Sequence, residues 1–145
     1  MKEIIIAKKE HLGAIAELER ETFFEPWSEQ ALELFVSENN FSIACVVDGC
    51  IASYCTVTTV LDEAQIINVA TDKRYRRTGC AKDVLNAVLL ECKKRGINLI
   101  SLEVRHSNAS AIALYEGIGF TVAGMRKDFY NNPRENALVM IRNLD

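Results

Sequence analysis

A basic turn that contains glycine and opens a helix is the strongest structural signal in this sequence. The turn runs from Arg76 to Ala81 and includes Gly79. An apolar stretch from 66 to 71, which predicts a buried strand, comes directly before it. The first N–H groups of a helix have no partner within the helix, and the helix dipole adds partial positive charge there. A strand, a basic turn and a helix in this order therefore predict a phosphate-binding site.

The segment after the turn has the periodicity of an amphipathic helix. Its apolar residues recur at steps of three, four and seven, and they are Ala81, Val84, Leu85, Val88, Leu89 and Cys92. This spacing places them on one helix face. Lys93, Lys94 and Arg95 then precede Gly96, which is a common way for a helix to end.

Composition limits the classes of protein that fit. The chain has 145 residues, of which 49% are hydrophobic and 26% charged, so we expect one soluble globular domain over 1–145. The net charge of −3 argues against a general nucleic-acid binder, although five of the seventeen Lys and Arg residues fall between 73 and 82. The sequence has no apolar run of about 18 residues and no signal-peptide pattern. We therefore expect a cytoplasmic protein that binds neither membrane nor nucleic acid directly.

The pattern of apolar, turn and capping residues predicts a mixed α/β fold. We expect strands at 3–7, 41–47, 50–60, 64–71, 98–104, 119–125 and 136–141, and helices at 9–24, 28–38, 81–95 and 108–117. The element order is β-α-α-β-β-β-α-β-α-β-β. Ser28 is the expected N-cap of the second helix, and Asp48-Gly49 the expected hairpin turn.

Cysteine and histidine spacing gives no support for a metal site. The five cysteines form no CxxC pair, and Cys50 and Cys55 would lie on opposite faces of one strand. We therefore expect free thiols. His11 and His106 lie in no triad or HExxH pattern, so we predict no metal ligands and no histidine-based triad.

Two polar residues in the second half are unusual for pure packing. Glu103 lies within an otherwise apolar strand, where a carboxylate is costly to bury unless it is paired or reaches a wet cleft. It would either pair with Arg105 or the basic turn, or serve as a catalytic group. Tyr115 lies near the end of the 108–117 helix, where it would either pack in the core or act in a site.

These residues carry a resemblance to a known family. Arg76-x-x-Gly79-x-Ala81 resembles the Q/R-x-x-G-x-G/A signature of the GNAT superfamily of N-acetyltransferases. The segment 102–120, with Glu103, Asn108 and Tyr115, is similar to the ribosomal-protein-alanine N-acetyltransferases of the RimI type. Further matches are Pro26-Trp27-Ser28, 61–64, Asn68, Arg126 and Tyr130.

The resemblance implies a fold, a co-substrate and a site. The fold would be the GNAT fold, in which the strand before the turn splays from the next strand and admits the thioester of acetyl-CoA. The resemblance implies that Glu103 is the general base and Tyr115 the general acid. The acetyl-CoA-binding residues would be Val69, Ala70, Thr71, Arg77, Thr78, Gly79, Cys80, Ala81, Lys82 and Asn108. An N–H group near Val69 would polarise the thioester carbonyl.

The RimI-type resemblance also implies an acceptor, namely the N-terminal alanine of a small-subunit ribosomal protein. Glu25, Asp62 and Glu63 would either attract such a basic tail or be ordinary solvated acids. Trp27 would either line a peptide groove or pack the first helix against the core. The alternatives are an acetyltransferase that acts on a lysine side chain, a polyamine or another small molecule, and a non-catalytic CoA-binding module.

Overall fold

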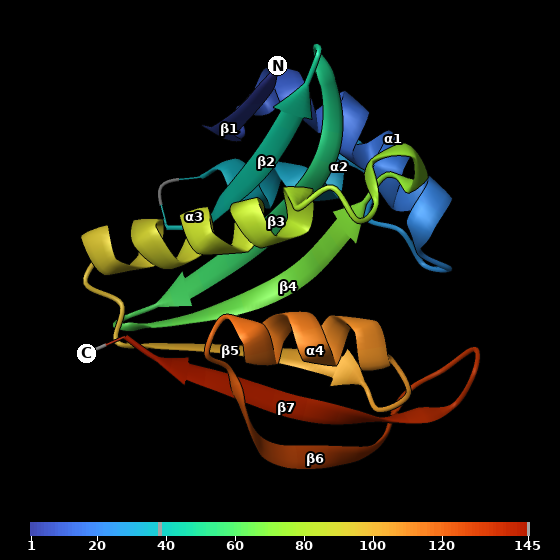
Figure 1. The fold of residues 1–145 in the computed structure, drawn as a ribbon, viewed down its shortest axis with the longest axis vertical. Helices are drawn as coiled ribbons and strands as arrows, with labels where there is room; N and C mark the ends of the chain where they lie inside the picture. Colours follow the sequence, from blue (N-terminus) through green and yellow to red (C-terminus); the bar gives the residue numbers. More distant parts are fainter. Residues whose placement is uncertain (38, 145) are drawn as a thin grey trace.

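The computed structural model describes residues 1–37 and 39–144, and its elements follow the predicted order (Figure 1). The strands are β1 (Lys2–Ile6), β2 (Phe41–Val47), β3 (Cys50–Val60), β4 (Glu63–Thr71), β5 (Leu99–Arg105), β6 (Thr121–Tyr130) and β7 (Glu135–Asn143). The α-helices are α1 (Leu12–Thr22), α2 (Glu29–Leu32), α3 (Cys80–Lys94) and α4 (Ala109–Gly117). Short 3-10 helices cover Lys9–His11, Glu33–Val36 and Lys73–Tyr75.

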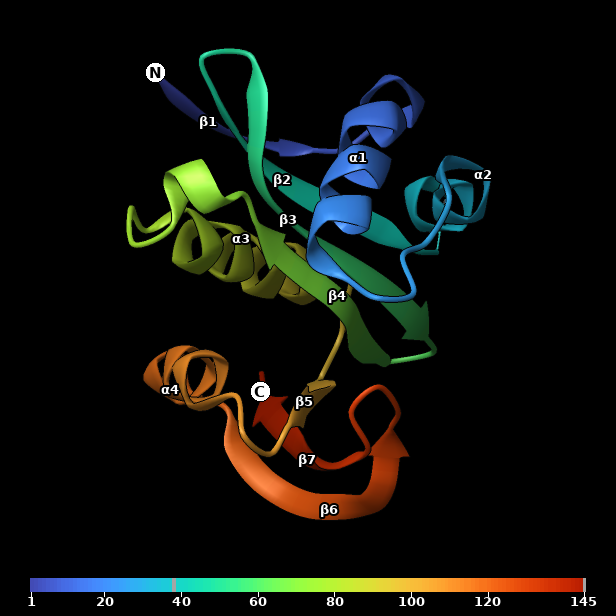
Figure 2. The same cartoon turned by 90° about the vertical axis from the view of Figure 1, so that its right-hand side faces the viewer.

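One mixed sheet organises the molecule. Its seven strands lie in the order β1-β2-β3-β4-β5-β7-β6, and β4 and β5 are the parallel pair. Their register begins at Glu63 opposite Leu99 and ends at Ile66 opposite Leu102. Beyond Ile66 the two strands separate, as Figures 1 and 2 show. The sheet is therefore open at its centre.

A β-bulge lies where this opening begins. Thr56 on β3 is opposite Asn68, but the next residue, Val57, is opposite Ile66, so Ile67 is an extra residue on β4. A bulge bends its strand and increases the local twist. The bend carries the second half of β4 away from β5 and creates the gap.

Helices cover both faces of the sheet (Figure 2). On one face, α1 and α2 pack over a core that includes Leu12, Ile15 and Tyr54. On the other face, α3 and α4 pack over a larger core, and the predicted stripe of α3 is buried at Val84, Leu85, Val88, Leu89 and Cys92. The 3.6-residue period of the apolar residues therefore predicted correctly which face of α3 packs against the sheet.

Local signals account for several element ends. The hydroxyl of Ser28 accepts a hydrogen bond from the Ala31 N–H at 3.1 Å, which confirms the predicted N-cap of α2. Asp48 and Gly49 have φ angles of 49° and 84°, as a tight hairpin turn requires. The second helix is shorter than predicted: α2 ends at Leu32 and the chain continues as a 3-10 helix over Glu33–Val36. Position 38, the predicted end of this helix, lies outside the described residues. Among the described residues, no helix has the length and apolarity needed to cross a lipid bilayer.

Candidate active site

The predicted phosphate turn has the geometry of an anion cradle. Arg77 and Gly79 both have left-handed φ angles, of 62° and 84°, and Gly79 is the N-cap of α3. The first hydrogen bond of α3 runs from the Asp83 N–H to the Gly79 carbonyl, at 3.0 Å. The N–H groups of the first turn therefore have no intrahelical acceptor. A Cβ atom at position 79 would find only Lys2 Nζ, at 4.0 Å, so the space over the turn is open.

Side chains around the turn divide into two groups. Arg77, Thr78 and Lys82 are exposed, and the two cations add positive charge beside the free N–H groups. Cys80 is buried, so it offers its main chain rather than its thiol. The sequence did not indicate Lys2, whose ammonium lies next to the turn and pairs with Asp83 at 2.6 Å.

The predicted pantetheine-binding residues lie on β4 after the bulge. Val69 lines the gap between β4 and β5, whereas Ala70 is buried and Thr71 pairs with Ser53 of β3. Asn108 also lines the gap. Its Oδ1 caps α4 by accepting from the Ala111 N–H at 3.1 Å, and its Nδ2 makes no hydrogen bond to another described residue.

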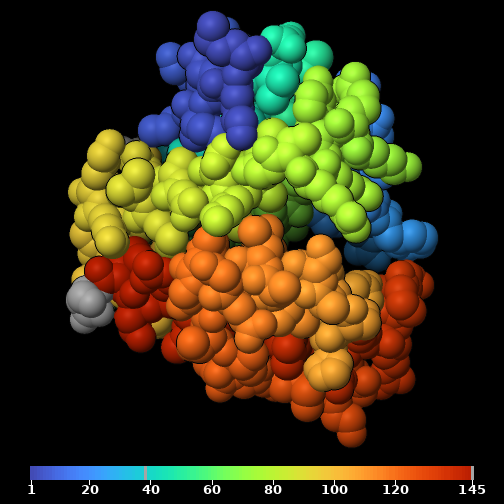
Figure 3. All heavy atoms as spheres, in the orientation of Figure 1, coloured from blue at the N-terminus to red at the C-terminus, as the bar shows by residue number. Residues whose placement is uncertain are grey.

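The opening of the sheet forms a cleft of about 710 Å³. It is lined by residues from the α1–α2 loop, β4, β5, α4 and the β6–β7 hairpin, including Trp27, Asn68, Glu103, Tyr115 and Tyr130. Figure 3 shows a hollow between the green atoms around the phosphate turn and the orange atoms of α4. Both predicted catalytic residues, Glu103 and Tyr115, line the cleft, whereas residues 76–82 of the turn are not among its lining residues.

Glu103 reaches this cleft from β5. Its side chain is 14% exposed, and its Oε1 accepts a hydrogen bond from Nε2 of Gln65 at 3.0 Å. Its Oε2 is buried, lies 2.9 Å from Nε of Arg126 as an ion pair, and accepts no aligned hydrogen bond in the described part of the chain. The considered pairing with Arg105 does not occur, because Arg105 pairs with Glu135 at 3.2 Å.

Tyr115 enters the same cleft from α4. The residue is 8% exposed, and its ring packs against Phe120 at a centroid distance of 6.0 Å. Burial raises the pKa of its phenol far above the ordinary value of 10.0. The phenol therefore keeps its proton at neutral pH, and its hydroxyl makes no hydrogen bond to another described residue.

Aromatic side chains from the α1–α2 loop and the β6–β7 hairpin border the cleft. Phe24 of the α1–α2 loop is 78% exposed and Phe129 of the β6–β7 hairpin 42% exposed. Trp27 fits both of the roles considered for it. Its ring packs edge-on against Phe35 at 5.3 Å, and the residue also lines the cleft. Exposed aromatic rings at a cleft mouth are suited to contact with a chain-like ligand.

The three acids considered as an electrostatic attractor do not act as a group. Glu25 lines the cleft. Asp62 accepts a hydrogen bond from Asn98 at 3.0 Å, and Glu63 starts the paired half of β4 opposite Leu99, away from the opening. Only Glu25 is therefore placed to meet a basic ligand in the cleft.

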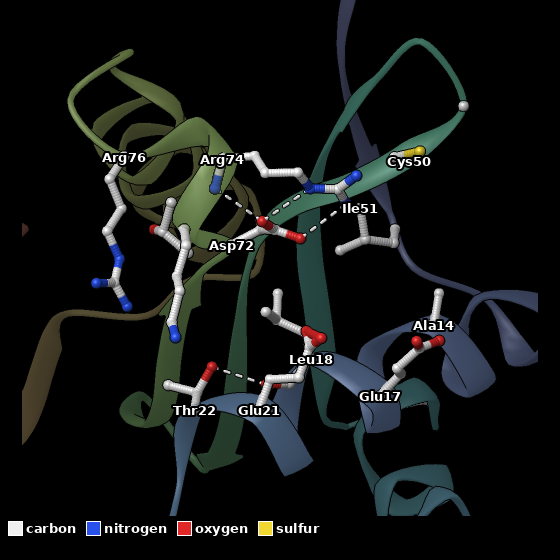
Figure 4. Close-up of a pocket in the computed structure, with 13 residues that line it drawn as sticks. Ala14, Glu17, Leu18, Glu21, Thr22, Cys50, Ile51, Asp72, Arg74 and Arg76 are labelled. Atoms are coloured by element: carbon white, nitrogen blue, oxygen red, sulfur yellow. Dashed lines mark hydrogen bonds and ion pairs between the residues drawn. The ribbon is translucent and has the colours of Figure 1, made fainter.

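A second hollow, of about 590 Å³, lies between α1, the β2–β3 hairpin and the segment after β4 (Figure 4). Acids of α1, including Glu17 and Glu21, face basic residues of that segment across it. Asp72 is already held by Arg74, with an ion pair of 3.0 Å. Neither Glu103 nor Tyr115 lines this hollow, so the cleft between β4 and β5 is the candidate active site.

The cysteines are free thiols, four of them buried and Cys50 exposed. A β-bulge leaves Ala52 as an extra residue between Cys50 and Cys55 on β3, so the alternation from which opposite faces were predicted is interrupted there. Within residues 1–37 and 39–144, His, Cys, Asp and Glu form no group of three or more that could hold a metal ion.

Comparisons with known proteins agree with this geometry. Residues 12–120 match the model of the Acetyltransferase (GNAT) family. The chain is 37% identical to the [ribosomal protein bS18]-alanine N-acetyltransferase of Escherichia coli (strain K12), over 89% of this chain and 88% of that protein. It is 34% identical to the enzyme of that name from Salmonella typhimurium, over 97% and 96% of the two chains. A crystal structure of the ribosomal-protein-S18-alanine N-acetyltransferase from Escherichia coli superposes with a TM-score of 0.92 at 34% identity, covering 100% of this chain and 95% of that one.

This molecule combines a sheet that opens beside the predicted phosphate turn with a carboxylate and a phenol that line the opening. The chain belongs to the GNAT acetyltransferase family.

Proposed function

We propose that this enzyme transfers the acetyl group of acetyl-CoA to the N-terminal α-amine of a protein, and that the acceptor is the N-terminal alanine of a small-subunit ribosomal protein. Relatives named as [ribosomal protein bS18]-alanine N-acetyltransferases support the acceptor. The aromatic rings of Phe24 and Phe129 and the acid Glu25 at the cleft support a peptide over a small amine. A basic peptide tail would find both apolar contact and one favourable charge there.

Acetyl-CoA would bind with its pyrophosphate over the turn from Arg77 to Lys82. The free N–H groups of α3, the open space at Gly79 and the exposed cations support this placement. The pantetheine would follow the unpaired edge of β4 from Val69 to Thr71 and exchange main-chain hydrogen bonds with it. The amide of Asn108, whose Nδ2 is free of protein partners, would hold the same molecule from α4.

The observation that carries the proposal is the state of Glu103. One of its oxygens is buried in the cleft, where it is ion-paired with Arg126 at 2.9 Å but accepts no aligned hydrogen bond, while Gln65 holds the other. A free α-amine has a pKa of about 7.7–8.0, so most of it is protonated at neutral pH and must lose a proton before it attacks. Glu103 would accept that proton, directly or through a water molecule.

The reaction then needs one acid. The amine nitrogen attacks the thioester carbonyl, a C–N bond forms, and the C–S bond breaks as CoA leaves. Tyr115, whose raised pKa keeps it protonated, would give its proton to the departing thiolate. The nitrogen loses its second proton as it becomes an amide, and uptake of a proton by the phenolate would restore Tyr115. No covalent enzyme intermediate is required, because the thioester is already activated, and the buried Cys80 thiol belongs to the phosphate end of the site.

A peptide panel tests the acceptor. Each peptide contains an internal lysine and begins with alanine, with its N-terminus either free or chemically blocked. The proposal predicts that mass spectrometry finds one acetyl group on the α-amine of the free peptides and none on the blocked ones. Acetylation confined to lysine, or equal on both sets, would contradict it.

A further inference from the structure

Glu19 of α1 is a fully buried carboxylate that the proposed chemistry does not use. It is 0% exposed. Its Oε1 accepts a hydrogen bond from the backbone N–H of Trp27 at 2.9 Å. Its Oε2 accepts from Nδ2 of Asn68 at 3.1 Å and from the hydroxyl of Tyr54. One side chain therefore ties together the α1–α2 loop, β4 and β3.

Two of these three partners are parts of the cleft. Trp27 lies in the loop that forms the acceptor side of the cleft, and Asn68 lies at the bulge where β4 leaves β5. The backbone N–H of Asn68 donates to Oγ1 of Thr56 at 3.2 Å, so the bulge is held from both sides. Tyr54 is 0% exposed and does not line the cleft.

A carboxylate at this core position is energetically unfavourable compared with an apolar side chain. Glu19 has hydrogen-bond donors but no cationic partner among residues 1–37 and 39–144, and burial of a carboxylate without a cation is unfavourable. An apolar side chain would pack beside Ile15 and Leu12 without that penalty. A carboxylate, however, can accept from several donors at once and so fix their relative positions.

We propose that Glu19 is a positioning residue that sets the acceptor side of the cleft, by holding the Trp27 loop at a fixed place relative to the β4 bulge. The inference rests on the proposed peptide-acceptor function. Loss of the carboxylate would let the loop move while the phosphate turn, which makes no hydrogen bond to Glu19 in the described part of the chain, stays in place. Acceptor binding would then weaken and acetyl-CoA binding would not.

The test compares Glu19→Gln and Tyr54→Phe with Ser42→Ala. Gln keeps the volume of Glu19 but presents an amide N–H to one of its donors, and Phe removes only a hydroxyl that lies outside the cleft. Ser42 is the matched control, because it is also a buried hydroxyl and donates to the Phe35 carbonyl at 3.1 Å, away from the cleft. Tyr54→Phe provides the test if Glu19→Gln fails to fold.

Kinetics give the first readout. We expect both variants to raise the KM for an alanine-starting peptide by on the order of tenfold, with the KM for acetyl-CoA changed less than about twofold and a smaller effect on kcat. Ser42→Ala should lose stability without this split. Unchanged peptide KM in both folded variants, or an equal shift in Ser42→Ala, would overturn the positioning role.

A second readout does not depend on activity. Trp27 is the single tryptophan of the sequence, so its fluorescence and its backbone amide report on the loop alone. We expect a longer emission wavelength and faster hydrogen exchange at the Trp27 amide in Glu19→Gln than in the wild type. Ser42→Ala is a control for the kinetics alone, because its partner Phe35 packs against the Trp27 ring. If the wild type does not acetylate peptides, the proposed function fails, and these signals still decide whether Glu19 holds the loop. Unaltered fluorescence and hydrogen exchange in Glu19→Gln would refute the positioning role of Glu19.

Discussion

Nε2 of Gln65 on β4 donates to Oε1 of Glu103 on β5 across 3.0 Å, next to the point where the two strands separate. The contact fixes one carboxylate oxygen and leaves the other facing Arg126 and the cleft. Gln65 of the neighbouring strand β4, rather than a residue of β5, therefore orients the carboxylate of the proposed base.

Replacement of Gln65 by Met should weaken catalysis without affecting the co-substrate. The change keeps the side-chain length but removes the donor to Oε1. A hydrogen bond to a charged group is worth about 1.5–3 kcal/mol, so we expect kcat to fall roughly tenfold or more. Gln30→Met on α2 is the matched control and should leave kcat unchanged. Steady-state kinetics with calorimetry for acetyl-CoA would decide, and a wild-type kcat in Gln65→Met would contradict the orienting role.

Tyr115→Phe should lower kcat by on the order of 100-fold, because the leaving thiolate loses its proton donor. Burial raises the pKa of Tyr115 above 10.0, so the wild-type phenol stays protonated beyond the range where an ordinary tyrosine ionises. The ratio of wild-type to variant kcat should therefore remain constant as the pH rises to about 10. Tyr75→Phe, outside the cleft, serves as the control. A ratio near one, or a ratio that collapses below pH 10, would exclude Tyr115 as the acid.

Gly79→Val should abolish acetyl-CoA binding. The φ of Gly79 is +84°, and a side chain there would both strain the backbone and occupy the open space over the turn. Gly49 is a matched control, since its φ is also +84° and a Cβ there would meet nothing within 4 Å. We expect Gly49→Val to lose comparable stability and retain affinity in calorimetry. Normal affinity in Gly79→Val would refute the phosphate turn.

Glu19 should make the enzyme less stable as the pH rises. Burial raises its pKa above 4.5, against the opposing hydrogen bonds from Trp27 and Asn68. The native state then holds this proton more tightly than the unfolded state, so stability falls as the pH rises through the window between 4.5 and the native pKa. The Tm of the wild type minus that of Glu19→Gln should decrease between acid and neutral pH. A difference that grows with pH would contradict the assignment.

The sequence was sufficient for most of the fold. The stripe of α3, the Asp48-Gly49 turn and the Ser28 cap are local patterns, and each is present in the structure. The bulge at Ile67 was not predictable, because it lies in an apolar run without alternation and forms through pairing with β3. The end of β6 was also missed, since the strand continues to Tyr130 beyond the apolar segment.

The site was predictable only in part. Glu103 was conspicuous as an acid in an apolar strand, but its partners Gln65 and Arg126 are distant in the sequence. Arg126 was noted only as a match to the family, and nothing local indicated that either residue contacts Glu103. Glu19, in contrast, has a local signal in the sequence that the prediction did not use. It follows Ile15 by four residues and Ala16 by three, and so lies on the apolar face of α1. A charged residue on such a face indicates a specific partner.

The central claim is that Glu103 removes the proton from the acceptor amine, and Glu103→Gln tests it most directly. The measurement is the turnover of an alanine-starting peptide, with acetyl-CoA affinity measured on the same samples and Glu116→Gln, an exposed acid of α4, as the control. The account predicts that Glu103→Gln lowers kcat by on the order of 100-fold or more while acetyl-CoA still binds, and that Glu116→Gln behaves as the wild type. Wild-type turnover in Glu103→Gln would contradict it.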